Sequence, residues 1–128
     1  MATKKEILII EDDPQMHEIY KDMLDKEKYN ITSVYKPLKA LSLIQDEKRT
    51  FDLILLDILM EDYLFDGRTF FVQLREVLKD KTPVIVITVL NQEQIDDLKN
   101  LDQEVSYLRK PFEQEDLIAE IQAKTRSN

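Results

Sequence analysis

The 128-residue sequence contains no cysteine and only one glycine, Gly67. The absence of cysteine excludes disulfides and thiolate metal sites. Loops that surround phosphate groups with backbone N–H groups need several glycines, so a P-loop or a dinucleotide-binding loop is excluded as well. Any phosphate chemistry in this chain therefore has to depend on side chains and a metal ion.

The sequence also lacks a long apolar run and an excess of positive charge. Its apolar runs are far shorter than the roughly 18 residues that a membrane-spanning helix requires. The first apolar run is also too short for the hydrophobic region of a secretory signal. The net charge is −8, which argues against a nucleic-acid surface because phosphates are neutralised by basic patches. These features predict a cytoplasmic protein that associates with no membrane and does not bind nucleic acid directly.

Short runs of apolar residues predict five strands. The runs 7–10, 53–56 and 84–87 consist of leucine and β-branched residues, which is typical of strands buried on both faces of a parallel sheet. Two weaker runs, 31–35 and 105–108, contain polar residues and are predicted to form the sheet edges.

Each predicted strand is followed by apolar residues at helical spacing, with Pro14 suited to a first helical turn and Asn91 to an N-cap. Alternating strands and helices predict an α/β fold with a parallel sheet between two helical layers. Three central and two edge strands fit the order 2-1-3-4-5, a flavodoxin-like (βα)5 three-layer sandwich. We expect residues 1–128 to form a single domain.

Polar residues follow the strong strands where each one ends. Glu11 and Asp12 follow the first strand and Asp57 follows the third, while the fourth ends at Thr88 and the fifth leads to Lys110. In open α/β sheets, ligands bind beyond the carboxyl ends of the strands where the strand order reverses, here between strands 1 and 3. We therefore expect these side chains to converge at one edge of the sheet.

Each of these residues also has an ordinary structural interpretation. Acidic residues after a strand often stabilise a helix N-terminus, a threonine suits a strand, and a lysine is usually solvated. Their coincidence at successive strand ends favours a functional site. Carboxylates gathered without His or Cys predict a hard cation, for which we expect Mg²⁺, and a carboxylate beside it can attack phosphorus to form an acyl phosphate. Transfer would then depend on neutralising phosphoryl charge through Mg²⁺, Lys110 and Thr88.

Four segments resemble the receiver domains of response regulators, and the resemblance extends from about Lys5 to Ala123. The matching segments are Ile7-Leu8-Ile9-Ile10-Glu11-Asp12-Asp13-Pro14, Phe51-Asp52-Leu53-Ile54-Leu55-Leu56-Asp57-Ile58, Pro83-Val84-Ile85-Val86-Ile87-Thr88 and Tyr107-Leu108-Arg109-Lys110-Pro111-Phe112. Each motif alone is moderately specific, whereas the set together is highly specific.

The resemblance implies a role for each site residue. Asp57 would be the phosphoacceptor, with Glu11, Asp12, Asp57 and the backbone carbonyl of Leu59 forming the Mg²⁺ site. Lys110 would bind the phosphate. Thr88 and Tyr107 would be the switch hydroxyl and the switch aromatic. The Lys110–Pro111 bond would be cis.

The resemblance also implies partners. These are a histidine kinase or phosphotransfer protein as donor, and a downstream target or an output domain that reads the face built by the fourth helix, the fifth strand and the fifth helix. The protein would be a phosphoacceptor that catalyses only its own phosphorylation and autodephosphorylation, and the sequence leaves dimerisation open. A metal-dependent hydrolase is a weaker alternative, because Leu59 stands where the common aspartyl-phosphate hydrolases place a second Asp. A constitutive interaction module is a third, and a histidine phosphotransfer domain would be all-helical.

The sequence departs from the family pattern near the expected site. The loop 61–66 is longer than usual, and we expect its apolar residues to fold back locally, although it could instead screen the site or contact a partner. Val89 replaces a small residue and should crowd the approach of small phosphodonors. Leu59 and Leu90 should exclude water, which predicts a long-lived phosphorylated state. The only histidine, His17, is expected to be exposed or partly packed.

Overall fold

The computed structural model describes residues 3–60 and 65–126 and contains a five-stranded parallel sheet. The strands are β1 (Lys5–Ile10), β2 (Tyr29–Val34), β3 (Leu53–Leu56), β4 (Val84–Thr88) and β5 (Ser106–Arg109). Their order is β2-β1-β3-β4-β5, which confirms the predicted topology. The strand order reverses between β1 and β3, so the carboxyl ends of these two strands flank the expected crevice.

The two edge strands are shifted from their predicted ranges. β2 starts at Tyr29 rather than at residue 31, because Lys5 and Glu6 of β1 pair with Tyr29 and Asn30 and extend the ladder toward its amino end. It ends at Val34, so Tyr35 lies beyond the strand. Edge strands carry mixed polar and apolar residues, and pairing with the neighbouring strand decides their limits.

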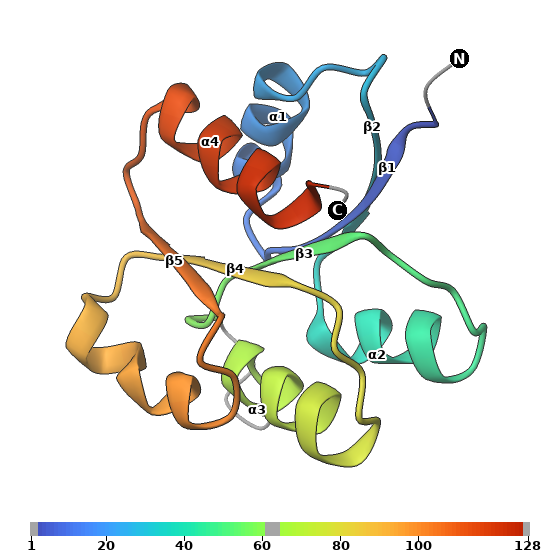
Figure 1. Ribbon diagram of the computed structural model, residues 1–128, viewed down its shortest axis with the longest axis vertical. Coiled ribbons are helices and arrows are strands. Elements are labelled where there is room, and N and C mark those ends of the chain that lie inside the picture. Colours follow the sequence, from blue (N-terminus) through green and yellow to red (C-terminus); the bar gives the residue numbers. More distant parts are fainter. Residues whose placement is uncertain (1–2, 61–64, 127–128) are drawn as a thin grey trace.

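Helices cover both faces of the sheet. They are α1 (Pro14–Met23), α2 (Pro37–Gln45), α3 (Gly67–Val72) continued by the π-helical turn η1 (Gln73–Val77), the 3₁₀ helix η2 (Gln92–Asn100), and α4 (Gln114–Thr125). In Figure 1, α1 and α4 lie on one face of the sheet and α2, α3 and η2 on the other, so the predicted three-layer arrangement is confirmed. Across the described residues, no helix combines the length and apolar character needed to cross a membrane.

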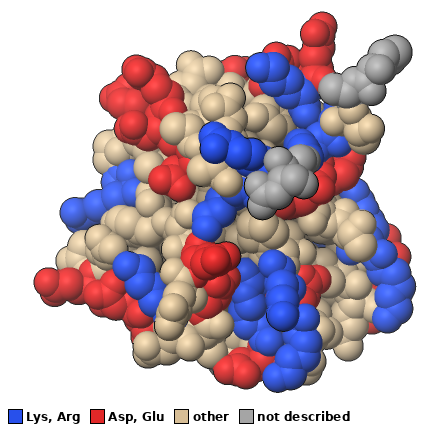
Figure 2. Space-filling view, viewed as in Figure 1, with Lys and Arg blue, Asp and Glu red and all other residues tan. Residues whose placement is uncertain are grey.

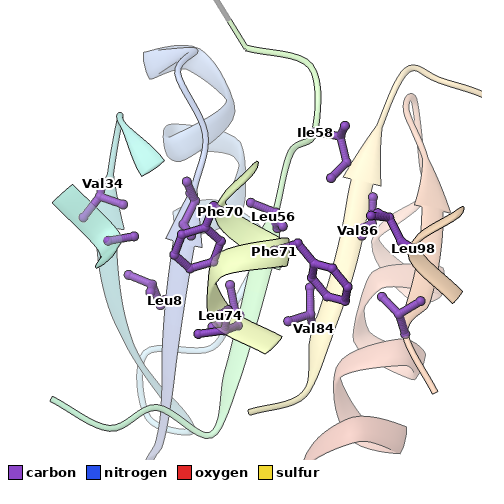
Figure 3. Close-up of a cluster of buried hydrophobic side chains, with 14 of the residues drawn as sticks. Leu8, Val34, Leu56, Ile58, Phe70, Phe71, Leu74, Val84, Val86 and Leu98 are labelled. Atoms are coloured by element: carbon purple, nitrogen blue, oxygen red, sulfur yellow. The ribbon is translucent and has the colours of Figure 1, made fainter. Parts of the chain in front are cut away.

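Alternating side chains of the central strands build two apolar cores. In β1, Leu8 and Ile10 join the core beneath α2 and α3, whereas Ile7 and Ile9 join the core beneath α1 and α4. All four are 0–1% exposed, as expected for a strand covered on both faces. Figure 3 shows the first core, in which Phe70, Phe71 and Leu74 pack against side chains of β1, β3 and β4.

The predicted fourth helix forms as a 3₁₀ helix, η2. Asn91 is its N-cap as predicted, in a capping box with Gln94: the Asn91 side chain accepts from the Gln94 N–H, and the Gln94 side chain accepts from the Asn91 N–H. The apolar residues Ile95, Leu98 and Leu101 recur at intervals of three. That spacing aligns side chains along one ridge in a helix with three residues per turn, and Ile95 and Leu98 are 0–1% exposed on the core.

Candidate functional site

Carboxylates from the ends of β1 and β3 meet in the predicted crevice. Glu11, Asp12 and Asp57 each offer one oxygen, and these oxygens lie within 4.8 Å of one another. Glu11 is 1% exposed and Asp57 is 7% exposed. The Asp57 N–H donates to the carbonyl of Ile10 at 3.1 Å, which continues the β1–β3 pairing and fixes the aspartate directly beside the end of β1.

The ammonium group of Lys110 joins the two most buried carboxylates. Its Nζ donates to Asp57 Oδ2 at 2.9 Å and also forms an ion pair with Glu11 Oε1. The second oxygen of each carboxylate has a backbone donor: Asp57 Oδ1 accepts from the Leu59 N–H at 3.1 Å, and Glu11 Oε2 accepts from the Asp13 N–H at 3.3 Å. Buried charges need such partners, so this network explains how two carboxylates are accommodated here.

Burial and charge repulsion change the acidity of these groups. Burial raises the pKa of the Glu11 carboxyl to about 7, with a further increase from the negative charge of Asp57, while Lys110 acts in the opposite direction. Burial would lower the pKa of Lys110, but hydrogen bonds to Asp57 and Glu11 outweigh it and raise that pKa. The site therefore has a strong demand for positive charge, which the lysine alone meets incompletely.

Thr88 and Tyr107 lie on the adjoining strands. Thr88, the last residue of β4, is fully buried, and its carbonyl accepts from the Lys110 N–H at 2.8 Å, which places Thr88 and Lys110 on neighbouring strand ends. The Tyr107 hydroxyl donates to the carbonyl of Leu90 at 2.5 Å and so connects β5 to the segment between β4 and η2. The Lys110–Pro111 bond is cis, as the sequence resemblance implied.

The single glycine stands directly behind the acidic cluster. Gly67 is the first residue of α3, and a Cβ atom built on it would lie 2.0 Å from the carbonyl oxygen of Asp57 and 2.8 Å from the Cα of Ile58. Real Cβ atoms essentially never approach other atoms below 3.0 Å. Only glycine therefore allows α3 to begin this close to the backbone of Asp57, a role that the sequence analysis did not assign.

Comparison with known proteins identifies the family. The family model of the response regulator receiver domain matches residues 7–122. The chain belongs to this family. It is 33% identical over 118 residues to the transcriptional regulatory protein CpxR of Klebsiella pneumoniae, covering 91% of this chain and 47% of that protein. The receiver domain thus spans about half the length of the curated relatives that it matches.

Solved structures of receiver domains have the same fold. The receiver domain of the Francisella response regulator 1452 matches with a TM-score of 0.81 at 24% identity, covering 96% of this chain and 98% of that one. The chemotaxis protein CheY4 of Vibrio cholerae matches with a TM-score of 0.80 at 21% identity, covering 94% and 98% respectively. At these identities the likeness concerns the fold alone, and together with the family match it confirms the predicted fold class. The acidic cluster Glu11, Asp12 and Asp57 fits the Mg²⁺-binding and phosphorylation site of such a domain.

The surroundings of Asp57 are partly open in this receiver domain. Val89 is 51% exposed and Leu59 is 52% exposed, whereas Leu90 packs against the core beneath α2 and α3. The loop residues Glu61, Asp62, Tyr63 and Leu64 lie outside the described residues. Phe65, near the end of this loop, packs against the same core, and the expectation that the loop folds back locally stays a prediction for the other residues.

An apolar hollow of about 360 Å³ adjoins the site of this receiver domain. It lies between α1 and the turn that follows β5. Its lining residues are Met16, Ile19, Met23, Val89, Lys110, Pro111 and Phe112. Lys110, which contacts Glu11 and Asp57, thus also lines this apolar surface, and Val89 lines it beside Lys110.

The expectation for His17 was wrong. This histidine is 1% exposed instead of being exposed or partly packed, and its Nε2 lies 2.7 Å from the backbone carbonyl of Glu11. Its ring meets the ring of Tyr35 edge-on, with the centroids 4.5 Å apart. His17 is on the flank of the apolar stripe of α1, and the β1–α1 turn and Tyr35 cover that flank. Only tertiary structure places these groups around it.

Proposed function

We propose that this receiver domain accepts a phosphoryl group on Asp57 from a histidine kinase or a histidine phosphotransfer protein in a Mg²⁺-dependent reaction. The observation that carries the proposal is the triad of Asp57, Glu11 and Lys110, in which a buried carboxylate at the end of β3 is held by an ammonium group beside a second buried carboxylate. A buried carboxylate with its oxygens fixed by donors is pre-positioned to attack phosphorus.

The donor set of the site fits Mg²⁺. Glu11, Asp12 and Asp57 provide only oxygen atoms, and their oxygens are close enough to share one cation. We assign Asp12 and Asp57 as direct ligands, Glu11 as a ligand through water and the backbone carbonyl of Leu59 as a further ligand. Bound Mg²⁺ would neutralise charge on the phosphoryl oxygens.

The protein side chains would supply the nucleophile, the remaining charge neutralisation and the switch response. One Asp57 carboxylate oxygen attacks phosphorus, the bond from phosphorus to the donor histidine nitrogen breaks, and that nitrogen keeps the electron pair. Lys110 already contacts Asp57, so its ammonium can move to a phosphoryl oxygen when the acyl phosphate forms. Thr88 would donate its hydroxyl to another phosphoryl oxygen, and Tyr107 would follow as the β4–η2 segment rearranges. These roles match the need for charge neutralisation in phosphoryl transfer.

The output would be a change in the face formed by η2, β5 and α4. The Tyr107–Leu90 hydrogen bond supports this, because it connects β5 to the segment that follows Thr88. We propose that a downstream target, or an output domain in a longer protein, reads this face. On the face that Figure 2 shows, basic and acidic side chains both occur, and acidic side chains border the basic cluster near its lower edge. The absence of direct nucleic-acid binding, the cytoplasmic location and the single-domain organisation stay predictions, and dimerisation stays open.

The proposed function is tested by forming the acyl phosphate directly. The protein should gain one phosphoryl adduct, measured by intact mass, when incubated with Mg²⁺ and either acetyl phosphate or a phosphorylated histidine kinase domain. EDTA or Asp57→Asn should abolish the adduct, while Asp52→Asn, at an exposed position just before β3, should not. Continuous release of phosphate without a stable adduct would indicate a hydrolase, and no adduct from either donor would indicate a constitutive interaction module. A half-life of seconds would contradict the predicted long-lived state.

Val89→Ala is expected to increase the rate of labelling by acetyl phosphate. Val89 is half exposed beside Lys110, so its removal opens the approach of a small donor without disturbing the core. The measurement is the initial rate of adduct formation at saturating Mg²⁺, with Val77→Ala as the control because Val77 is 61% exposed on η1. Equal rates for Val89→Ala and the unaltered protein would show that Val89 does not limit access.

A further inference from the structure

The buried imidazole of His17 contacts the turn that carries the acidic residues. His17 Nε2 lies 2.7 Å from the backbone carbonyl oxygen of Glu11. A carbonyl can only accept, so Nε2 carries the proton and donates it in this hydrogen bond. The bond joins α1 to the first residue beyond β1, where the strand ladder no longer provides a donor from a neighbouring strand for that carbonyl.

The other ring nitrogen has no comparable role. Nδ1 is buried and has no hydrogen-bond partner within the described part of the chain. A buried polar atom without a partner reduces stability, and an apolar side chain of similar size would avoid that loss. Packing alone therefore does not explain a histidine at this position. What the imidazole supplies, and leucine could not, is the donor to Glu11.

That donor completes the anchoring of one peptide unit. The Glu11 N–H donates to the carbonyl of Val34 at 3.1 Å, and its carbonyl accepts from His17, so the Glu11 main chain is held from both sides. The carbonyl belongs to the peptide that joins Glu11 to Asp12. Its direction therefore governs how the backbone of Asp12 is oriented, and with it the approach of the Asp12 carboxylate to Asp57. The edge-on contact with the Tyr35 ring restricts the position of the imidazole ring.

We propose that His17 is a positioning residue for the cation site, orienting the Glu11–Asp12 peptide so that the three carboxylates can share one metal ion. This inference rests on the proposed function, because it concerns the Mg²⁺ site assigned there. Partners that orient metal ligands from outside the coordination sphere typically change metal affinity by about 10- to 100-fold when they are removed. A purely structural histidine would change stability and leave metal affinity unaltered.

The test compares Mg²⁺ affinity with stability in matched variants. Affinity is measured by titrating MgCl₂ into ¹⁵N-labelled protein and following amide shifts, and stability by thermal unfolding in EDTA. His17→Leu should bind Mg²⁺ about 10-fold more weakly or worse, whereas His17→Gln, whose amide can donate from a similar position, should recover most of the affinity. Ile121→Val, in the core beneath α4, should lower the unfolding temperature and keep the unaltered affinity.

The outcomes separate the two proposals. Unaltered affinity in His17→Leu, or equal losses in His17→Leu and His17→Gln, would overturn the positioning role while leaving the Mg²⁺ site intact. Absence of Mg²⁺ binding by the unaltered protein would overturn both. If His17→Leu does not fold, Tyr35→Ala decides: its side chain is 48% exposed, so the fold should persist while the loosened imidazole weakens Mg²⁺ binding. Unaltered affinity in that variant would also contradict the role.

Discussion

Gly67→Ala is expected to lower the free energy of unfolding by about 3 kcal/mol, at the upper end of the usual cost of inserting a methyl group into packed structure. The added Cβ would lie 2.0 Å from the Asp57 carbonyl oxygen, and both partners are backbone, so no side chain can rotate to relieve the overlap. Alanine would otherwise favour a helix over glycine by about 1 kcal/mol. The clash outweighs this helix preference, so the substitution should destabilise the protein. Denaturant unfolding in EDTA measures the loss.

The same clash should disturb the site itself. To make room, either the start of α3 or the backbone of Asp57 must move, so phosphoryl labelling should slow as well. Asp66→Ala is the matched control: it removes the N-cap hydrogen bond to the Thr69 N–H at a typical cost of about 1 kcal/mol and places nothing against Asp57. A Gly67→Ala protein as stable as Asp66→Ala, with an unaltered labelling rate, would show that the approach of α3 to β3 is adjustable.

The fold was predictable because the strongest signals are local. β3 forms over the predicted residues Leu53–Leu56, and β4 contains the apolar run 84–87 and ends at Thr88 as predicted. Side chains of a strand point alternately to its two faces, so four consecutive apolar residues are all removed from water only when both faces are covered. This requirement predicts the limits of the strand without information on its neighbours. The limits of β2 were not predictable in this way, since its pairing with β1 decides where Tyr29 enters the sheet.

The type of each helix was harder to predict from the sequence than the presence of a helix. The helical spacing predicted after the fourth strand does not distinguish an α-helix from the 3₁₀ helix that forms, although the intervals of three between Ile95, Leu98 and Leu101 align best in the 3₁₀ helix. The π-helical turn over Gln73–Val77 has no counterpart in the sequence analysis. Such variants differ from an α-helix by small energies, so tertiary contacts select among them.

The candidate site was predictable wherever a residue ends a strand. Glu11, Asp57 and Lys110 converge because parallel strands bring their carboxyl ends to one edge, a consequence of topology alone. Gly67 and His17 could not be found from the same rule. Their contacts with the Asp57 and Glu11 carbonyls depend on where α3 and α1 pack, and a single sequence contains no signal for that.

Lys110→Met is expected to destabilise the metal-free protein by about 3 kcal/mol at pH 8, the lower limit typical of removing one partner from a buried ion pair. Lys110 contacts two carboxylates that are themselves almost completely buried, and methionine fills the volume without supplying charge. The loss should shrink at pH 5. The Glu11 carboxyl has a pKa raised to about 7 by burial, so the folded state binds a proton more tightly than the unfolded state does. Protonation of Glu11 therefore stabilises the folded state fully at low pH, and this stabilisation is lost as the pH rises through about 7.

Mg²⁺ should reverse this loss, because the cation supplies the charge that the lysine provided. In the unaltered protein the Lys110 ammonium already contacts oxygens of Glu11 and Asp57, so Mg²⁺ binding should stabilise that protein less than it stabilises Lys110→Met. The Mg²⁺-induced rise in unfolding temperature should therefore be larger in the variant. Lys110→Met combined with Glu11→Gln tests the cause. Removing one of the two uncompensated carboxylates should restore most of the stability in EDTA, giving a coupling between the two positions rather than additive losses. Additive losses, or equal Mg²⁺ effects with and without Lys110, would mean that the ammonium does not compete for the cation site.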